Sequence, residues 1–403
     1  MSALPGLAAR SLWNRRETAA LTVFAIAVSV ALLLGVQKLR TGARESFAAT
    51  ISGTDLVVGA RSGSVNLLLY SVFRIGEPTA NVSWDTYQKV AHHPDVAWTI
   101  PLSLGDSHRG FRVLGTSPGY FRHYRYASAR ALAFAAGRPL IGDGDAVLGA
   151  AVARALRYRV GTQLVVAHGI GRTSFMEHAG HPLHVVGILE STGTAVDRTV
   201  HVTLGAIEAM HGRPAQGVVP TGISAFLVGM KSRDTVLVMQ RALNDYRGEA
   251  VQAVIPGVAL TELWSVVGVA DRTLFVVAVL VALAGLLGML AMLLAGLNER
   301  RRELAILRSI GASLRQVAAL LLIEAVLLTG AGVACGIAFA YGLLAVARPW
   351  IAARYGIFLP LGGLDAPDAA LLAAVVASGL LLSVYPAWRA YRLSLADGLT
   401  VRL

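Results

Sequence analysis

One short segment near the middle of the chain is rich in side chains that bind transition metals. Three histidines and one glutamate lie close together there: Glu177, His178, His181 and His184. Imidazole and carboxylate groups suit zinc, copper or haem iron, and imidazole is largely neutral near pH 7. A zinc site needs three or four converging ligands, however, and Pro182 restricts how this segment can turn. The segment is therefore either a metal or haem site formed by His178, His181 and His184, or a solvated loop.

A second segment, 298–313, combines many charges with an apolar face and directly follows a long apolar block. At 100° per residue its apolar side chains fall on one arc of a helix, and Glu303 falls inside that arc. A carboxylate on an apolar face needs a cationic partner, which a protein groove provides better than lipid does. We therefore interpret the segment as a helix that docks on a protein, with a helix resting in the lipid interface as the alternative. The predicted docking residues are Glu299, Arg300, Arg302, Glu303, Leu304, Ile306, Leu307, Ile310 and Gly311.

Glu324 is an acidic residue inside another long apolar block. An ionisable group within a membrane span indicates a functional site by default. Because no second acid accompanies it, the sequence favours a bundle-facing carboxylate, paired with an arginine or a backbone group, over a proton relay. On the same block, Gly332 and Gly336 form a GxxxG pattern that predicts close helix packing. Ser313 and Gln316 have the spacing of a capping box, which predicts that a helix begins there.

The elements that carry these groups are predicted to be membrane helices. Apolar residues make up 55% of the chain and charged residues only 15%, below the roughly 25% typical of soluble domains. The mean hydropathy is +0.59, and four apolar blocks have the length of about 20 residues that a bilayer core requires. The predicted spans are 19–37, 273–297, 316–347 and 368–388. We interpret the first block as an uncleaved anchor, because its apolar core is too long for a signal peptide and no clean cleavage site follows it.

Arginines beside the apolar blocks predict the orientation of the chain. They are concentrated in the N-terminal helix 1–18, the segment 298–313 and the tail 389–403, which four spans place on one side of the membrane. The positive-inside rule assigns that side to the cytoplasm of a bacterial inner membrane. The large segment 38–272 and the short loop 348–367 are then extracytoplasmic. These arginines account for much of the net charge of +12, so nucleic-acid binding is not indicated.

The segment 38–272 is predicted to be a mixed α/β domain. Residues that favour strands lie between Gly or Pro turns at 55–59, 162–168, 183–189, 199–202 and 251–255, and helical patterns occur at 83–92 and 232–246. Helical patterns at about 37–50 and 260–272 predict that the first two spans continue out of the membrane as a stalk. The predicted fold class is an integral membrane α-helical protein with four transmembrane helices and a large mixed α/β extracytoplasmic domain. The single cysteine, Cys335, excludes an internal disulfide.

A family resemblance follows from three of these segments. Glu299 to Ser313 reads ERRRELAILRSIGAS and resembles the coupling segment of MacB/FtsX-like ABC transporter permeases. The sequence SLWNRR before the first span is similar to the family's N-terminal amphipathic helix, and YPAWRAYRLS, which starts at Tyr385, is similar to its C-terminal signature. The order of one span, a large external domain and three further spans also matches. MacB carries a fused ATPase, but this chain has no phosphate-binding GxxxxGK[ST] loop, so its layout is closer to lipoprotein-releasing permeases of the LolC/LolE kind or to haem-exporting permeases.

This resemblance implies a permease subunit that is not itself an enzyme. Two permeases, as two copies of this chain or as this chain and a paralogue, would assemble with two copies of a cytoplasmic ATPase subunit that binds ATP and Mg²⁺. In this family the motion of the ATPase passes through the coupling helix and the stalk to the external domain, a mode called mechanotransmission, and drives export or extraction of a substrate from the membrane or periplasm. Membrane lipids and a periplasmic adaptor or lipoprotein are further expected partners. No cofactor is expected in this chain, apart from zinc or haem as a ligand.

Two other functions stay open at this point. An FtsX-like regulator would use a similar ATPase and motion to activate a cell-wall hydrolase, although its external domain is generally smaller. A membrane-bound sensor would bind metal or haem through the histidines without associating with an ATPase.

Overall fold

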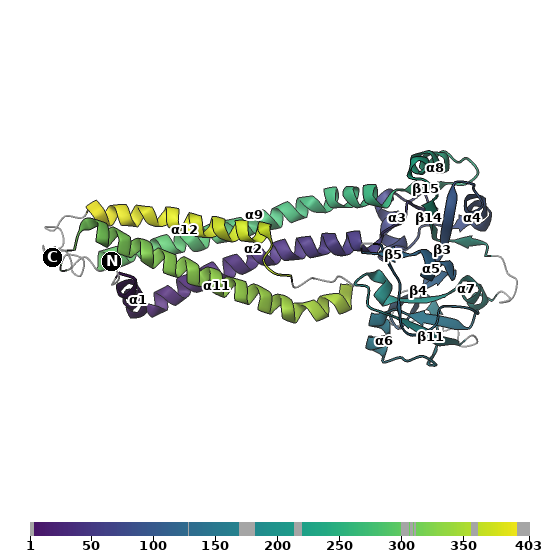
Figure 1. Cartoon of the computed structure of the whole chain (residues 1–403), viewed down its shortest axis with the longest axis horizontal. Helices are drawn as coiled ribbons and strands as arrows, with labels where there is room; N and C mark the ends of the chain where they lie inside the picture. The colour runs from purple at the N-terminus through teal and green to yellow at the C-terminus, as the bar shows by residue number, and fades with distance from the viewer. Residues whose placement is uncertain are drawn as a thin grey trace. The chain divides into compact units, whose positions relative to one another are not determined.

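The computed structural model describes residues 4–127, 129–168, 182–212, 220–299, 306, 309, 312–355 and 362–392. The chain divides into two compact units. The first unit comprises Met1–Thr41, Val269–Pro349 and Pro360–Leu403, and the second comprises Gly42–Gly268 and Trp350–Leu359. Long helices make up the first unit, and most of the strands and short helices belong to the second (Figure 1).

The first unit is built from helices. They are α1 (Leu4–Asn14), α2 (Arg16–Thr50), α9 (Pro256–Glu299), α11 (Leu314–Tyr355) and α12 (Ala366–Arg392). Among the described residues, α2, α9, α11 and α12 are long and apolar enough to cross a membrane, which confirms the four predicted spans. α11 runs on to Tyr355, so it occupies the first part of the segment 348–367 that was predicted to be a loop.

Apolar side chains from all four long helices form one core in this unit. The buried members include Ile26 and Leu34 of α2, Leu286 and Met289 of α9, Leu328 of α11 and Val375 of α12. The two glycines of the GxxxG pattern lie directly against α2: a Cβ at Gly332 would meet Ile26 Cγ2 at 2.5 Å, and one at Gly336 would meet the Ala27 carbonyl oxygen at 2.8 Å. Small residues of this kind allow two helix backbones to approach closely.

The second unit is a mixed α/β domain. Its strands are β1 (Leu56–Ala60), β2 (Val82–Ser83), β3 (Val96–His108), β4 (Phe111–Thr116), β5 (Arg125–Tyr126), β6 (Arg130–Ala131), β7 (Phe134–Gly137), β8 (Asp145–Leu148), β9 (Gln163–Leu164), β10 (Ala167–His168), β11 (Leu183–Leu189), β12 (Thr199–Thr203), β13 (Gly222–Ile223), β14 (Ala225–Met230) and β15 (Val251–Val254). Its helices are α3 (Ser64–Ser71), α4 (Trp84–Ala91), α5 (Gly119–His123), α6 (Ala150–Leu156), α7 (Leu204–Met210) and α8 (Val236–Asn244), with short 3₁₀ turns at Ala195–Arg198 and Arg233–Thr235.

Most of these strands join one sheet, in the order β15-β1-β14-β3-β4-β12-β8-β11-β7. The pairs β4–β12 and β8–β11 are parallel, and the other pairs along this path are antiparallel. Apolar clusters seat α4 and α8 on the part of the sheet that contains β1, β14 and β15, and seat α6 and α7 on the part that contains β8, β11 and β12. The domain therefore has the mixed α/β character that the sequence predicts.

Strand predictions succeeded where the burial pattern was simple. β11 has the predicted bounds 183–189, and its side chains alternate between buried and less buried positions. The predicted strand at 162–168 is wrong in extent, because the chain forms two separate two-residue strands there, β9 and β10. The long central strand β3 and its partner β4 were not predicted. β3 contains Pro101 and Gly105, which are uncommon inside strands, and its pairing with β4 shifts register between Leu104 and Ser107.

The parts of α2 and α9 that belong to the second unit pack against its core. Phe47 of α2 packs against Phe73 with ring centroids 4.3 Å apart and the two rings tilted by 45°, and its ring lies 5.7 Å from that of Trp264 on α9. Arg44 lies over the Trp264 ring at 5.4 Å, and the Tyr124 hydroxyl donates to the Thr50 carbonyl. The last turns of α2 and the first turns of α9 are thus joined to each other and to the domain.

Candidate functional site

The predicted coupling segment begins at the end of α9. Glu299 is the last residue of that helix. Ile306 is 54% exposed, and its carbonyl accepts a hydrogen bond from the Ser309 hydroxyl at 2.8 Å. The other predicted docking residues, Arg300, Arg302, Glu303, Leu304, Leu307, Ile310 and Gly311, lie outside the described residues. Their role stays a prediction, and the described site consists of the helix ends on either side of them.

On the far side of the segment, a reciprocal cap starts α11. The Ser313 N–H donates to Gln316 Oε1 at 2.8 Å, and the Gln316 N–H donates to Ser313 Oγ at 3.3 Å. This arrangement satisfies two backbone donors that the first turn of a helix leaves free. The predicted capping box is confirmed, and it fixes the residue at which the coupling segment gives way to α11.

Glu324 is held by the N-terminal helix. Its side chain is 4% exposed, and Ser11 of α1 donates a hydroxyl hydrogen bond of 2.5 Å to Oε1. Glu324 and Arg15 also line one small cavity, together with residues of α9 that include Leu293. The carboxylate therefore faces the helix bundle, as predicted, and Ser11 is one of its hydrogen-bond partners. Its predicted pairing with an arginine or a backbone group stays a prediction. The contact ties α1 to the cytoplasmic half of α11.

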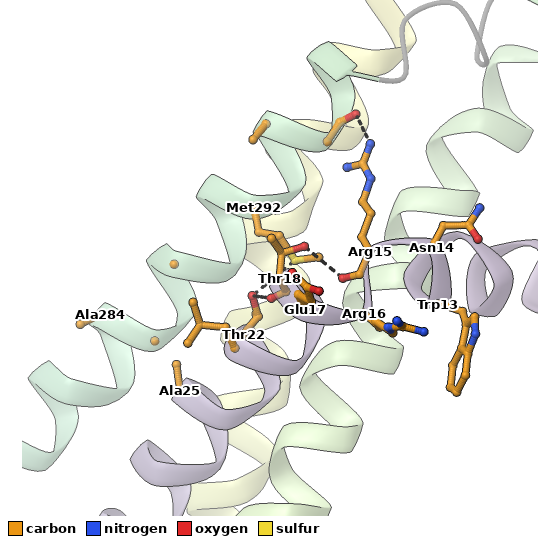
Figure 2. A pocket seen from close by; sticks show the side chains of 15 residues that line it. Trp13, Asn14, Arg15, Arg16, Glu17, Thr18, Thr22, Ala25, Ala284 and Met292 are labelled. Atoms are coloured by element: carbon orange, nitrogen blue, oxygen red, sulfur yellow. Dashed lines mark hydrogen bonds between the residues drawn. The ribbon is translucent and has the colours of Figure 1, made fainter.

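Arg15, at the junction between α1 and α2, holds the end of α9. Its guanidinium donates to the Gly296 carbonyl at 3.2 Å, as the dashed line in Figure 2 shows. A Cβ at Gly296 would clash with Nη1 of Arg15, so a larger residue there would displace the guanidinium. A cation near the last carbonyls of a helix also interacts favourably with the helix dipole. Ser11 and Arg15 together connect the N-terminal helix to the two helices that flank the coupling segment.

At the opposite membrane boundary, a lysine and two aspartates form a second polar cluster. Lys38 Nζ of α2 lies 2.7 Å from Asp368 Oδ2, 2.9 Å from Asp365 Oδ2 and 2.9 Å from the Gly363 carbonyl oxygen. The Asp365 N–H also donates to Asp368 Oδ2 at 3.1 Å, which caps the start of α12. Asp368 is 2% exposed, so its charge is compensated by contacts within the protein. We call Lys38, Gly363, Asp365 and Asp368 the lysine cluster.

A second ion pair lies close in sequence to the lysine cluster. Arg40 Nε of α2 is 2.8 Å from Asp271 Oδ2 of α9. Neither the lysine cluster nor this ion pair was predicted from the sequence. A signal was available, because Lys38 and Arg40 directly follow the first span while Asp271 and Asp365 directly precede the second and fourth, but the pairing depends on which spans are neighbours.

The predicted metal ligands are not brought together by the described part of the chain. His178 and His181 lie outside the described residues. His184 is exposed at the start of β11, and the side-chain amide nitrogen of Gln163 lies 3.0 Å from its Nε2. Among the described residues, no group of three or more histidine, cysteine or acidic side chains has the geometry to hold a metal ion. Metal or haem binding by His178, His181 and His184 therefore stays a prediction.

Another histidine of the domain, His201 on β12, lies in the hydrophobic core. It is fully buried against the rings of Tyr120 and Phe121, with centroid distances of 5.1 and 5.8 Å. Its Nδ1 lies 3.2 Å from the Val147 carbonyl oxygen, to which it donates. Burial, together with the nearby positive charge of Arg74, lowers the pKa of His201 to about 3. The residue is therefore neutral at physiological pH and belongs to the core.

Comparisons with known proteins agree with this architecture. Residues 19–246 match the family described as the MacB-like periplasmic core domain, and residues 275–395 match the FtsX-like permease C-terminal family. Among solved structures, the periplasmic region of MacB from Actinobacillus actinomycetemcomitans is 11% identical, with a TM-score of 0.36, and the match covers 53% of this chain and 94% of that one. A domain of a putative permease protein from Porphyromonas gingivalis is also 11% identical, with a TM-score of 0.27 and coverage of 51% and 88%.

No relative was found among curated proteins. The MacB-like match alone covers more than half of the chain. The two family matches follow one another in the predicted order: first the span and large external domain, then the three further spans. Together with the four apolar helices, they place the chain in the inner membrane with its large domain in the periplasm. The chain therefore belongs to the MacB/FtsX-like family of ABC transporter permeases.

Proposed function

We propose that this permease works by mechanotransmission, coupling ATP hydrolysis on a separate cytoplasmic ATPase to movement of its periplasmic domain. Two permeases, either two copies or this chain and a paralogue, would act with two ATPase subunits, which bind the ATP and Mg²⁺. The substrate would be exported or extracted from the membrane or periplasm.

The continuity of two helices carries this proposal. α2 has 35 residues and α9 has 44, and both contribute residues to the membrane unit and to the α/β unit. At 1.5 Å per residue they are about 52 and 66 Å long, whereas the hydrocarbon core of a bilayer is about 30 Å thick. A helix without a break transmits displacement along its axis, because each backbone hydrogen bond resists stretching. Motion delivered at the coupling segment would thus reach the first turns of α9, which pack on the domain.

Contacts at both ends of the membrane unit support the same function. Near the cytoplasm, Ser11 and Arg15 tie α1 and α2 to α11 and α9. At the periplasmic boundary, Arg40 pairs with Asp271, and the lysine cluster joins α2 to α12. A displacement of one helix end would therefore be shared among the long helices instead of being lost in one of them.

The interior of the membrane unit favours extraction over passage through a wide pore. Its buried hydroxyl groups already have partners within the protein. Ser29 Oγ lies 2.7 Å from the Ala25 carbonyl oxygen and 3.1 Å from the Val281 carbonyl oxygen of α9. Ser383 donates to the Leu380 carbonyl at 2.7 Å. Thr329 lies 3.4 Å from the Met289 sulfur. Apolar side chains surround these groups. A hydrophilic substrate would find few hydrogen-bonding partners along this core.

Charge reversal at Glu303 tests the docking assignment. Glu303→Lys should leave the protein in the membrane but abolish co-purification with its ATPase and the stimulated ATP turnover, because a lysine replaces the carboxylate inside the apolar arc. Arg301→Glu is the matched control and should keep most of the binding. At 100° per residue, Arg301 falls outside the arc formed by Leu304, Ile306, Leu307 and Ile310. Unchanged ATPase binding and turnover in Glu303→Lys would show that 298–313 does not dock in this way.

A further inference from the structure

A cavity of about 910 Å³ lies beside the junction of α1 and α2 and extends along α9. Figure 2 shows its lining: the first turns of α2 form one wall, and α9 forms the other. The lining along α9 extends from Ala284 to Gly296, which is about 18 Å at 1.5 Å per residue. One leaflet of the hydrocarbon core is about 15 Å thick, so the cavity has the depth of a single leaflet.

The two ends of the cavity differ in chemistry. The deep end is lined by Ala25, Ala284, Gly285 and Gly288. Between the ends, the Thr22 hydroxyl donates to the Thr18 carbonyl at 2.9 Å and lies 3.3 Å from the Met292 sulfur, so it is already bonded inside the protein. This part of the cavity is suited to an apolar chain.

The cytoplasmic end of the cavity carries charges of both signs. Trp13, Arg16 and Glu17 all line it and are exposed, and Trp13 is 72% exposed. Arg15 also lines the cavity, but its guanidinium donates a hydrogen bond to the Gly296 carbonyl. An exposed tryptophan and an exposed arginine at the end of a span are typical of the depth at which phospholipid headgroups lie. An arginine matches a phosphate, and an adjacent carboxylate matches an ammonium group.

We propose that this cavity binds a phospholipid of the cytoplasmic leaflet whose headgroup carries both a phosphate and a primary amine. The phosphate contacts Arg16, the ammonium contacts Glu17, and one acyl chain lies along the small residues of α9. The lipid thereby fills the space next to the junction of α1 and α2, where Arg15 contacts the end of α9 and Ser11 contacts the cytoplasmic half of α11. This site is independent of the proposed mechanotransmission, because it depends only on the cavity and on its charges.

Lipid retention by the purified full-length chain tests the proposal. The chain is reconstituted in nanodiscs containing equal amounts of phosphatidylethanolamine and phosphatidylglycerol, extracted in mild detergent, and examined by native mass spectrometry. We expect one tightly retained phosphatidylethanolamine per chain. Arg16→Gln should reduce its retention about fivefold, since one arginine near a phosphate contributes about 1 kcal/mol. Glu17→Gln should remove the preference over phosphatidylglycerol while retaining a lipid.

Two further variants separate the alternatives. A Cβ at Gly288 meets no atom within 4 Å, so Gly288→Leu can fold while its side chain fills the acyl part of the cavity. Gly288→Leu should lose the lipid. Arg389→Glu, a charge reversal at an exposed residue outside the cavity lining, should retain it. Equal lipid retention by the wild type and Gly288→Leu would overturn the proposal, as would equal retention of the two lipids by the wild type. If Gly288→Leu dissociates a dimer without changing lipid retention, the cavity is filled by a second copy of the chain and the proposal is wrong.

Discussion

His201 is enclosed by aromatic rings and has one ring nitrogen bonded to the backbone. Its Nε2 has no hydrogen-bond partner among the described residues, so a proton added there would be buried without compensation. An unfolded chain binds that proton below about pH 6.5, whereas the folded chain, in which the pKa is about 3, does not. Between these two values the unfolded state holds more protons. The free energy of unfolding therefore falls as the pH is lowered, by about 1.4 kcal/mol per pH unit from this residue.

This linkage predicts the pH dependence of stability. In the full-length protein, His201→Phe should fit among the neighbouring rings and give a smaller loss of Tm between pH 6.5 and 4.5 than the wild type shows. Desolvation also lowers the pKa of His108 and of His123, so part of the decrease of Tm with falling pH should persist in His201→Phe. His92→Phe, at an exposed position, is the control and should keep the full slope. Thermal unfolding followed by intrinsic fluorescence measures these values, and an unchanged slope in His201→Phe would contradict the assignment.

Single residues were identified from the sequence when their type was unusual for their position. Glu324 stood out because an acid is costly inside an apolar block. Its partner Ser11 did not, because a serine before a span is unremarkable until the fold places it beside α11. Lys38 and Asp368 were missed for the same reason, since the sequence alone does not say that the first and fourth spans are neighbours.

At the scale of helices, the packing of the α11 glycines against α2 predicts how substitutions on α11 change thermal stability. Gly336→Leu should destabilise the membrane unit by about 3 kcal/mol, the upper end for overpacking, because the new side chain meets the backbone of α2, which cannot rotate away. Gly330→Leu is the matched control on the same helix, since a Cβ there meets nothing within 4 Å. Thermal stability in detergent should fall only for Gly336→Leu. Equal Tm values for the two variants would show that α2 and α11 do not pack through this face.

The reliability of the element predictions followed the strength of the local pattern. The membrane helices were found because apolar runs of this length are rare in water-soluble domains and therefore indicate membrane spans. β11 was found because Leu183–Leu189 is rich in residues that favour strands and follows Pro182. In contrast, β3 was missed because its polar residues and Gly105 are accommodated by pairing with distant β14 and by a register shift against β4. Such pairing energy comes from residues far apart in the chain, which no local window contains.

At the scale of the whole molecule, the orientation can be tested by chemical labelling. In a Cys335→Ala background, a cysteine at Gly144 should react with a membrane-impermeant maleimide in cells whose outer membrane has been opened. Gly144 is exposed, and a Cβ there meets nothing within 4 Å, so the substitution should be tolerated. Ser309→Cys should react only after the inner membrane is permeabilised. The reverse pattern would contradict the assignment of 38–272 to the periplasm.

The lysine cluster also limits which motions are available to the membrane unit. An ammonium group has three donors, and here they meet acceptors at Gly363, Asp365 and Asp368, all at the start of α12. If α2 slid past α12 by one helical turn, about 5.4 Å, the Lys38 contacts would break and the enclosed Asp368 carboxylate would lose its counter-ion. A swing of the two helices about the cluster keeps the contacts. In the proposed mechanotransmission, the cluster would therefore act as a pivot between α2 and α12: it opposes axial sliding of α2 past α12 and leaves rotation about the cluster as the motion of lower energy.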